Sequence, residues 1–281
     1  MKFSLVLGTI NRTEELEGFL ASLAQQIYQN FELVVVDQNV DKRLYPVLEQ
    51  YRDYFSIVHL YSEPGLSKAR NIGLKYTTGD IIAFPDDDCE YPQDLLIRVQ
   101  KFFLANPGWD GLCGRAVDHK GRTSMGRFDS LSGTVGYLNV WRRGISFTLF
   151  LKRRVTEVVG LFDEGLGIGA KKPFHSGEET DYLIRAIKSD FRIYYDPKIT
   201  VRHPNPIKGY NNKVIRRGYF YGKGMGRVWR KHNYPLLFVM ANLTRPLGGA
   251  LISLFSANWS KFKYHYAMFK GRLKGWLSSL D

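Results

Sequence analysis

Residues 81–88 read Ile-Ile-Ala-Phe-Pro-Asp-Asp-Asp, an apolar run that ends abruptly in three carboxylates. Such runs are typical of strands that are buried on both faces of a parallel sheet. Because side chains alternate along a strand, we expect Asp86 and Asp88 on one side and Asp87 on the other. Neighbouring carboxylates repel each other unless a cation lies between them, and Mg²⁺ and Mn²⁺ prefer oxygen ligands. The stretch therefore indicates either a metal site or an acidic turn that caps the helix expected near Pro92.

Apolar strands alternate with amphipathic helices around this stretch. Strands are expected at residues 3–7, 31–36, 57–60 and 81–84, and helices at residues 14–26, 44–54 and 92–104. This alternation predicts an α/β fold with a mainly parallel sheet flanked by helices. Ligands of such sheets bind beyond the carboxyl ends of the strands. Polar residues gather at these ends: Asn11, Arg12, Asp37, Arg70 and residues 86–88. We therefore expect one shared site.

Two common classes of nucleotide-binding enzyme are excluded by the loop after the first strand. It contains no Gly-x-Gly-x-x-Gly and no Walker-type sequence, which argues against a dinucleotide-dependent dehydrogenase and a P-loop enzyme. A metal and basic side chains would have to hold phosphates instead. Further along, Glu178, Glu179 and Asp181 open an expected helix after Gly177. The helix dipole favours acids in a first turn, but three acids in four residues exceed what capping needs.

The charge of the chain is unevenly distributed. The net charge is +13, yet residues 202–281 carry 15 Lys and Arg residues and a single acid, Asp281. This asymmetry predicts an anionic partner for the C-terminal segment. Residues 236–257 are apolar apart from Arg245 and a few small polar residues, and aromatic residues lie among the flanking basic ones. We expect Arg245 and Pro246 to prevent a simple membrane span, because the charge is costly there and Pro breaks a helix.

The composition of this tail favours helices that associate with an anionic membrane, either lying in its interface or re-entering it. A soluble helical cap, a dimer interface and a surface for single-stranded nucleic acid are the alternatives, and we expect no nucleic-acid partner because the apolar run has no role in one. The chain enters a strand at Phe3 with no signal-type segment, and Cys89 and Cys113 lack metal-ligand spacing. We therefore expect a cytoplasmic protein, peripheral on the inner face of the plasma membrane.

Seven elements in chain order resemble an inverting glycosyltransferase of family 2 with the GT-A fold. They are Asn11-Arg12, Asp37, Ser67–Gly73, Phe84–Asp88, Gly160–Glu164, Gly177–Arg185 and Val201-Arg202-His203. The resemblance covers residues 3–205. It implies a transferase domain at residues 1–205, with a nucleotide-sugar half at about 1–108 and an acceptor half at 109–205. Residues 206–281 would form the basic, aromatic-rich helical tail.

The resemblance also implies roles for individual residues. Asp37 would contact the base or ribose of the donor, and Thr9, Asn11, Arg12 and Arg70 would line the nucleotide pocket. Asp86 and Asp88 match the Asp-x-Asp motif. Asp88 would be a direct ligand of Mn²⁺ or Mg²⁺, and Asp86 would hold the ribose or metal-bound water, with Asp87 also at the nucleotide-sugar site. His203 matches a further metal ligand of some relatives; the alternative is a surface histidine before a Pro-Asn-Pro turn.

Glu179 occupies the position of the catalytic base. The chain has Glu178-Glu179 where the family usually has Glu-Asp, so Glu178 and Asp181 remain alternatives. A single carboxylate that accepts the proton of the acceptor hydroxyl implies in-line attack and inversion. The implied activity is transfer of a sugar, of the hexosyl or deoxyhexosyl class, from a nucleoside-diphosphate sugar.

The implied acceptor is a saccharide, or a lipid-linked saccharide, in surface polysaccharide biosynthesis. Two other hypotheses remain open. A nucleotidyltransferase would usually begin with a glycine-rich basic loop, which is absent here. A sugar-nucleotide-binding membrane scaffold or relic transferase would have no need of the intact acids.

Overall fold

The computed structural model describes residues 1–205 and 209–279, and these residues form two compact units. The first contains residues 1–162 and 182–205. The second contains residues 163–181 and the described residues from 209 onward. The segment 163–181, which includes the acids at 178, 179 and 181, thus belongs with the C-terminal helices. The predicted domain boundary after residue 205 stays a prediction, and residues 206–208 and 280–281 of the predicted tail lie outside the described residues.

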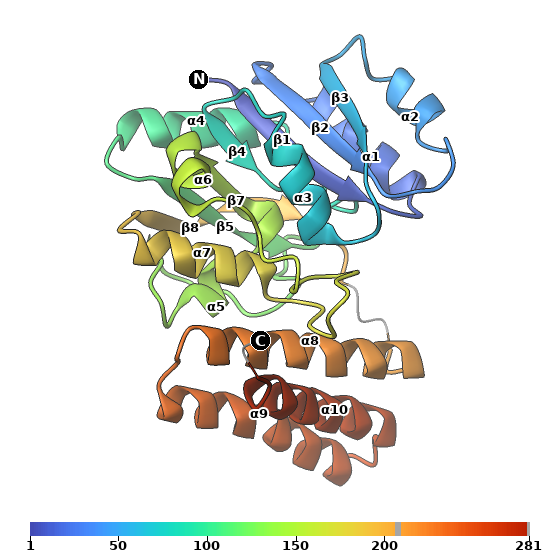
Figure 1. Ribbon diagram of the computed structural model, residues 1–281, viewed down its shortest axis with the longest axis vertical. Helices are drawn as coiled ribbons and strands as arrows, with labels where there is room; N and C mark the ends of the chain where they lie inside the picture. Colours follow the sequence, from blue (N-terminus) through green and yellow to red (C-terminus); the bar gives the residue numbers. More distant parts are fainter. Residues whose placement is uncertain (206–208, 280–281) are drawn as a thin grey trace. The chain divides into compact units, whose positions relative to one another are not determined.

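A mixed eight-stranded sheet forms the centre of the first unit (Figure 1). Its strands are β1 (Phe3–Thr9), β2 (Phe31–Asp37), β3 (Ser56–Tyr61), β4 (Ile81–Ala83), β5 (Gly111–Val117), β6 (Gly133–Thr134), β7 (Leu149–Lys152) and β8 (Ile193–Arg202). They lie in the order β3-β2-β1-β4-β7-β5-β8-β6. β3, β2, β1 and β4 are parallel to one another, and β5 is parallel to β8.

The predicted α/β fold is confirmed, with differences in its second half. β7 runs antiparallel to β4 and β5, and β6 runs antiparallel to β8. β7 begins at Leu149, directly after a 3₁₀ turn at Ser146–Thr148. β8 is one strand whose pairing with β5 shifts register between Cys113 and Arg115 of β5.

Helices cover both faces of the sheet. They are α1 (Glu14–Ala24), α2 (Tyr45–Glu49), α3 (Leu66–Leu74), α4 (Leu95–Ala105), α5 (Val140–Arg143), α6 (Arg153–Val159) and α7 (Glu178–Lys188). Leu5 and Leu7 of β1 join the core built from α1 and α4, whereas Val6 faces α3, where a Cβ on Gly73 would lie 2.5 Å from its side chain. Because both faces are covered, the strands read as continuous apolar runs rather than as alternating ones.

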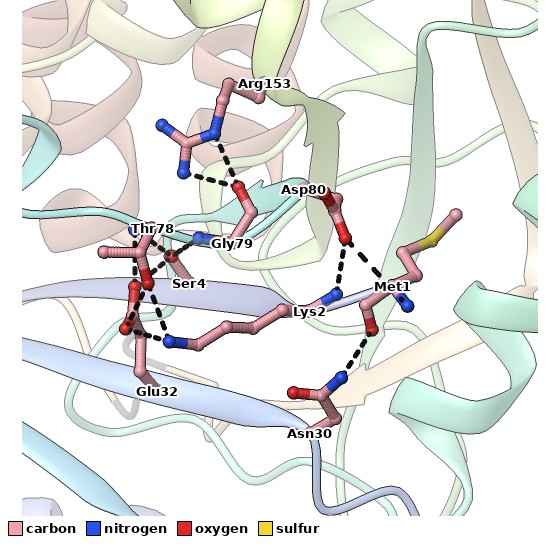
Figure 2. Close-up of polar contacts among 9 residues, drawn as sticks. All are labelled: Met1, Lys2, Ser4, Asn30, Glu32, Thr78, Gly79, Asp80 and Arg153. Carbon is pink, nitrogen blue, oxygen red and sulfur yellow. Dashed lines mark hydrogen bonds and ion pairs between the residues drawn. The ribbon is translucent and has the colours of Figure 1, made fainter.

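A buried carboxylate ties the start of β4 to β1 and β2 (Figure 2). Glu32 accepts hydrogen bonds from Lys2 Nζ at 2.6 Å, Ser4 Oγ at 2.5 Å and both the amide and the hydroxyl of Thr78, at 2.6 and 2.7 Å. Burial alone would raise its pKa, but these hydrogen bonds outweigh burial and lower the pKa of Glu32 to about 2. The cluster fixes the turn that leads into the strand before the three acids.

Three helices, α8 (Asn212–Lys231), α9 (Leu236–Phe255) and α10 (Trp259–Trp276), make up the helical part of the second unit. α8 and α10 approach so closely that a Cβ on Gly226 would lie 2.1 Å from the carbonyl oxygen of Arg272. α9 runs through Pro246 without a break, so the expected interruption at this residue was wrong. In length and composition α9 is able to cross a membrane, and 28% of its apolar window is buried within the protein. Composition and length alone are weak support for a span.

Candidate functional site

The predicted polar residues of the first unit lie where β1, β2 and β4 end. Thr9 and Asp37 are the last residues of their strands and face each other in the parallel register. β4 ends at Ala83, so Asp86–Asp88 lie in the turn that follows and not in the strand itself. The expected alternation of strand side chains therefore does not apply to these three acids.

Asp87 is a buried carboxylate held by β1 and the loop that follows β1. Its two oxygens accept hydrogen bonds from Thr9 Oγ1 at 2.6 Å and from Arg12 Nη1 at 2.5 Å. Burial raises the pKa of Asp87, and the charge of Arg12 only partly offsets this effect. Arg12 also pairs with Asp88 Oδ2 at 2.7 Å. One arginine thus links two of the three acids, while part of its own side chain stays exposed.

Asp86, Asp88 and His203 form a cluster of possible metal ligands, with one donor atom of each within 4.8 Å of the others. His203 follows β8, and its Nε2 lies 3.0 Å from Asp88 Oδ1. Burial raises the pKa of Asp86 to about 6, against the attraction of Arg70 and His203. Two carboxylates and one imidazole suit Mn²⁺, and the carboxylates suit Mg²⁺. The donor set therefore fits a divalent cation.

Arg70 and Asp37 extend this cluster on two sides. Arg70, in α3, is fully buried between the rings of Phe84 and Phe162, and its Nη2 lies 3.2 Å from Asp86 Oδ1. Asp37 accepts hydrogen bonds from the amide and side chain of Asn39 at 2.8 and 2.7 Å.

The loop after β1 approaches the same asparagine. The Asn11 amide donates to Asn39 Oδ1 at 2.8 Å, from a left-handed backbone conformation with φ of 56°. His59 of β3 lies 3.2 Å from Asp37 Oδ2. The nucleotide-side residues therefore share one edge of the sheet, and Asn39 and His59 were not expected from the sequence.

Glu178, Glu179 and Asp181 lie in the first turn of α7. This turn belongs to the second unit, which includes α7 only as far as Asp181. Asp181 is fully buried, and its Oδ1 lies 2.8 Å from both Lys231 Nζ and His232 Nε2. Lys231 also pairs with Asp163 at 2.7 Å. Glu178 is buried and Glu179 is half-buried. Asp181 therefore anchors this turn to the end of α8, and the choice of base among the three acids stays a prediction.

Glycines allow α8 to lie directly against the chain that leads into α7. Ser176 Oγ donates to the carbonyl of Tyr221 at 2.8 Å, and a Cβ on Gly224 would lie 2.3 Å from the carbonyl oxygen of Ser176. Gly177 has a φ of 90° and faces Val228, so only glycine fits there without strain. Sequence reasoning did not identify this contact, although the glycines at 218, 222, 224 and 226 are an unusual density for a helix.

No individual role was predicted from the sequence for Asn71. Its side-chain amide donates to the carbonyl of Phe162 at 3.0 Å and accepts from the Phe162 amide at 2.7 Å. Phe162 in turn stacks on Tyr182 with ring centroids 4.2 Å apart. Asn71 therefore holds the end of the Gly160–Phe162 segment against α3.

Comparisons with known proteins agree with this geometry. The family model for glycosyl transferase family 2 matches residues 4–162. Glycosyltransferase AglE of Haloferax volcanii is 25% identical over 248 residues, which cover 85% of this chain and 77% of AglE. Some relatives match over less of their length: the chain spans 35% and 42% of two glycosyltransferases of Haemophilus influenzae.

Solved structures confirm the GT-A fold. A mannosyltransferase of Pyrobaculum calidifontis, in complex with GDP-Man and Mn²⁺, superposes with a TM-score of 0.65 at 16% identity, over 98% of this chain and 87% of that chain. Staphylococcus aureus TarS 1–349, in complex with UDP-GlcNAc, gives 0.58 at 18% identity, over 98% and 92%. The resemblance deduced from the motifs is confirmed, and the chain belongs to glycosyl transferase family 2.

Proposed function

We propose that the protein is a metal-dependent, inverting transferase that moves a hexosyl or deoxyhexosyl group from a nucleoside-diphosphate sugar to a hydroxyl of a saccharide acceptor. The observation that carries the proposal is the cluster of Asp86, Asp88 and His203 at the strand ends, next to Arg12 and Arg70. Support also comes from the solved relatives, whose structures contain GDP-Man with Mn²⁺ or UDP-GlcNAc.

The first unit would bind the donor. Arg12 and Arg70 place two guanidinium groups beside the acids, where they attract the diphosphate. Asp37 lies at the end of the neighbouring strand and would accept hydrogen bonds from the ribose or base. A divalent cation held by Asp86, Asp88 and His203 would neutralise charge on the departing diphosphate as a Lewis acid. The burial of Arg70 keeps its guanidinium in one orientation.

The proposed base lies in the first turn of α7. Glu179 would accept the proton of the acceptor hydroxyl during in-line attack, which is typically worth about 10²- to 10⁴-fold in rate. Glu178 and Asp181 are the alternatives. Asp181 is the weaker of these, because its carboxylate is committed to Lys231 and His232.

A panel of sugar nucleotides tests the proposed activity. Purified protein with Mn²⁺ should release nucleoside diphosphate from one member of the panel, and Glu179→Gln should release it at least about 10²-fold more slowly with unchanged donor affinity. The matched control is Glu157→Gln, a substitution in α6. Donor binding without turnover in the wild type, with every saccharide acceptor tried, would instead favour the relic-transferase alternative.

We also propose that the C-terminal helices place the enzyme on the inner face of the plasma membrane, where a lipid-linked acceptor would be found. Leu237, Ile252 and Phe255 of α9 are 85%, 68% and 92% exposed. Residues 209–279 contain no acidic residue. An exposed apolar face in a purely basic segment suits an anionic bilayer.

Liposome sedimentation tests this placement with the full chain. Wild-type protein should sediment with anionic liposomes and much less with neutral ones, and Leu237→Glu with Phe255→Glu should stay in the supernatant. Leu131→Glu is the matched control, since Leu131 is 74% exposed in the first unit. If the α9 double variant and Leu131→Glu sedimented equally with anionic liposomes, the result would contradict a role for α9 in membrane binding.

A further inference from the structure

One face of α8 carries a cluster of cations that the proposed chemistry does not use. Arg216, Lys223 and Arg227 recur at helical spacing, so they lie along one side of α8. Phe174 lies between two of them, with Lys223 Nζ 5.6 Å and the Arg227 guanidinium 5.3 Å from its ring centroid. His175 stacks on Phe220 at 4.7 Å, and Arg216 lies 5.7 Å from the same ring. We call Arg216, Lys223, Arg227 and His175 the α8 cation cluster.

Within residues 1–205 and 209–279, the cations of this cluster have no carboxylate partner. Among the residues that the structure describes, no ion pair joins Arg216, Lys223 or Arg227 to an acid; Arg227 donates to the carbonyl of Ser279. Partial burial and the charges of Arg216 and Lys223 lower the pKa of His175. Like charges held together without a counter-ion repel, and an anion that binds among them removes this repulsion.

The cluster lies along α8 from the acids that open α7. His175 faces Phe220, a Cβ on Gly177 would touch Val228, and Asp181 contacts His232. The chain from His175 to Asp181 therefore follows α8 in the same direction. At about 1.5 Å per residue, the level of Val228 is roughly 12 Å beyond that of Phe220. An extended acceptor could thus place a hydroxyl near Glu178 and Glu179 and an anionic group at the cluster.

We propose that the α8 cation cluster binds a phosphate group of the acceptor, so that the enzyme glycosylates a phosphate-bearing saccharide. Arg216 lies beside the ring on which His175 stacks and Lys223 beside the ring of Phe174, and two such cations match the charge of a phosphate ester better than that of a single carboxylate. Arginine offers a planar fork for phosphate oxygens and lysine a point charge. This inference rests on the proposed transferase function and deepens it by naming the acceptor class.

A histidine reporter within the cluster allows a direct test. Full-length protein, with its donor site saturated by nucleoside diphosphate and diamagnetic Mg²⁺, is titrated with a soluble hexose 1-phosphate at constant ionic strength. The ring resonances of His175, assigned with His175→Gln, should shift and saturate. Arg216→Gln, at an exposed position, and Lys223→Gln should each weaken this binding by at least about tenfold. Lys270→Gln, which removes an exposed cation from α10, should leave it unchanged.

Two results of the His175 titration would contradict phosphate binding at the cluster. Unmoved His175 resonances, or equal titrations in Arg216→Gln and wild type, would overturn the proposal. A phospholipid headgroup is the other source of the same chemistry. If Arg216→Gln and Lys223→Gln lost sedimentation with anionic liposomes as fully as the α9 variant does, the cluster would bind lipid, and the proposal of an acceptor phosphate would be overturned. Failure of the transferase function is distinguishable, because the sugar-nucleotide panel would then release no nucleoside diphosphate, whereas the His175 resonances report phosphate binding directly.

Discussion

Gly224→Ala should slow catalysis without weakening donor binding. A Cβ at this position of α8 would lie 2.3 Å from the carbonyl oxygen, 2.6 Å from the hydroxyl and 2.8 Å from the amide nitrogen of Ser176. A carbon and a carbonyl oxygen normally stay about 3.3 Å apart, so the backbone of Ser176 has to retreat by roughly 1 Å. Glu178 and Glu179 follow two and three residues later.

This displacement sets the expected magnitude. A misplacement of about 1 Å costs on the order of 10²-fold in rate, equivalent to about 2.7 kcal/mol of activation free energy. The overall stability should change less, because overpacking costs about 1–3 kcal/mol while Ala gains about 1 kcal/mol of helix propensity over Gly. The residues that would bind the donor belong to the first unit, so its dissociation constant should stay within about twofold.

The assay is steady-state release of nucleoside diphosphate at saturating donor, with calorimetric titration of the donor on the same preparations. Gly248→Ala is the matched control, because no atom lies within 4 Å of a Cβ built at this position of α9. It should retain wild-type kcat. A kcat for Gly224→Ala within about threefold of wild type, or a loss confined to donor affinity, would refute the idea that α8 positions the base-bearing turn.

Two further predictions concern stability. Glu32→Gln should lower the free energy of unfolding by about 1–2 kcal/mol at pH 7. Hydrogen bonds from Lys2, Ser4 and Thr78 outweigh burial and hold the pKa of Glu32 at about 2. The stability difference between wild type and Glu32→Gln should therefore be complete above pH 4.5 and vanish as the pH falls toward 2. Urea unfolding between pH 3 and 7 measures it, and a pH-independent difference would contradict the assignment. Asn71→Ala should cost about 2–4 kcal/mol, since it leaves two backbone groups of Phe162 without their partner; a change below about 0.5 kcal/mol in thermal unfolding would argue that water replaces the amide.

The first half of the fold could be predicted because its signals are local. Apolar runs end at Thr9, at Asp37 and, after Ala83, at Asp86–Asp88, and parallel pairing brings these ends together. The distribution of partners among the acids depended on tertiary contacts instead. Nothing near Asp87 in the sequence announces that Thr9 and Arg12, about 75 residues earlier, bind it.

The second unit was less predictable for two physical reasons. Pro246 was expected to break α9, yet the helix continues through this buried residue, which lacks the amide hydrogen of one backbone hydrogen bond. The buried pairing of Asp181 with Lys231 and His232 joins residues 50 positions apart, and an acid in a first helical turn looks the same in sequence whether it acts as a base, a cap or an anchor.

Thermal stabilisation by nucleoside diphosphates tests the central claim most directly. Uridine, guanosine, thymidine and adenosine diphosphates are compared with and without Mn²⁺ in wild type, Asp88→Asn and the exposed control Asp53→Asn. Ligand at about 100 times its dissociation constant stabilises by about 2.7 kcal/mol. The account predicts a Mn²⁺-dependent shift with one base that persists in Asp53→Asn and disappears in Asp88→Asn. No shift with any base, or an equal shift in Asp88→Asn, would contradict a metal-dependent donor site at these acids.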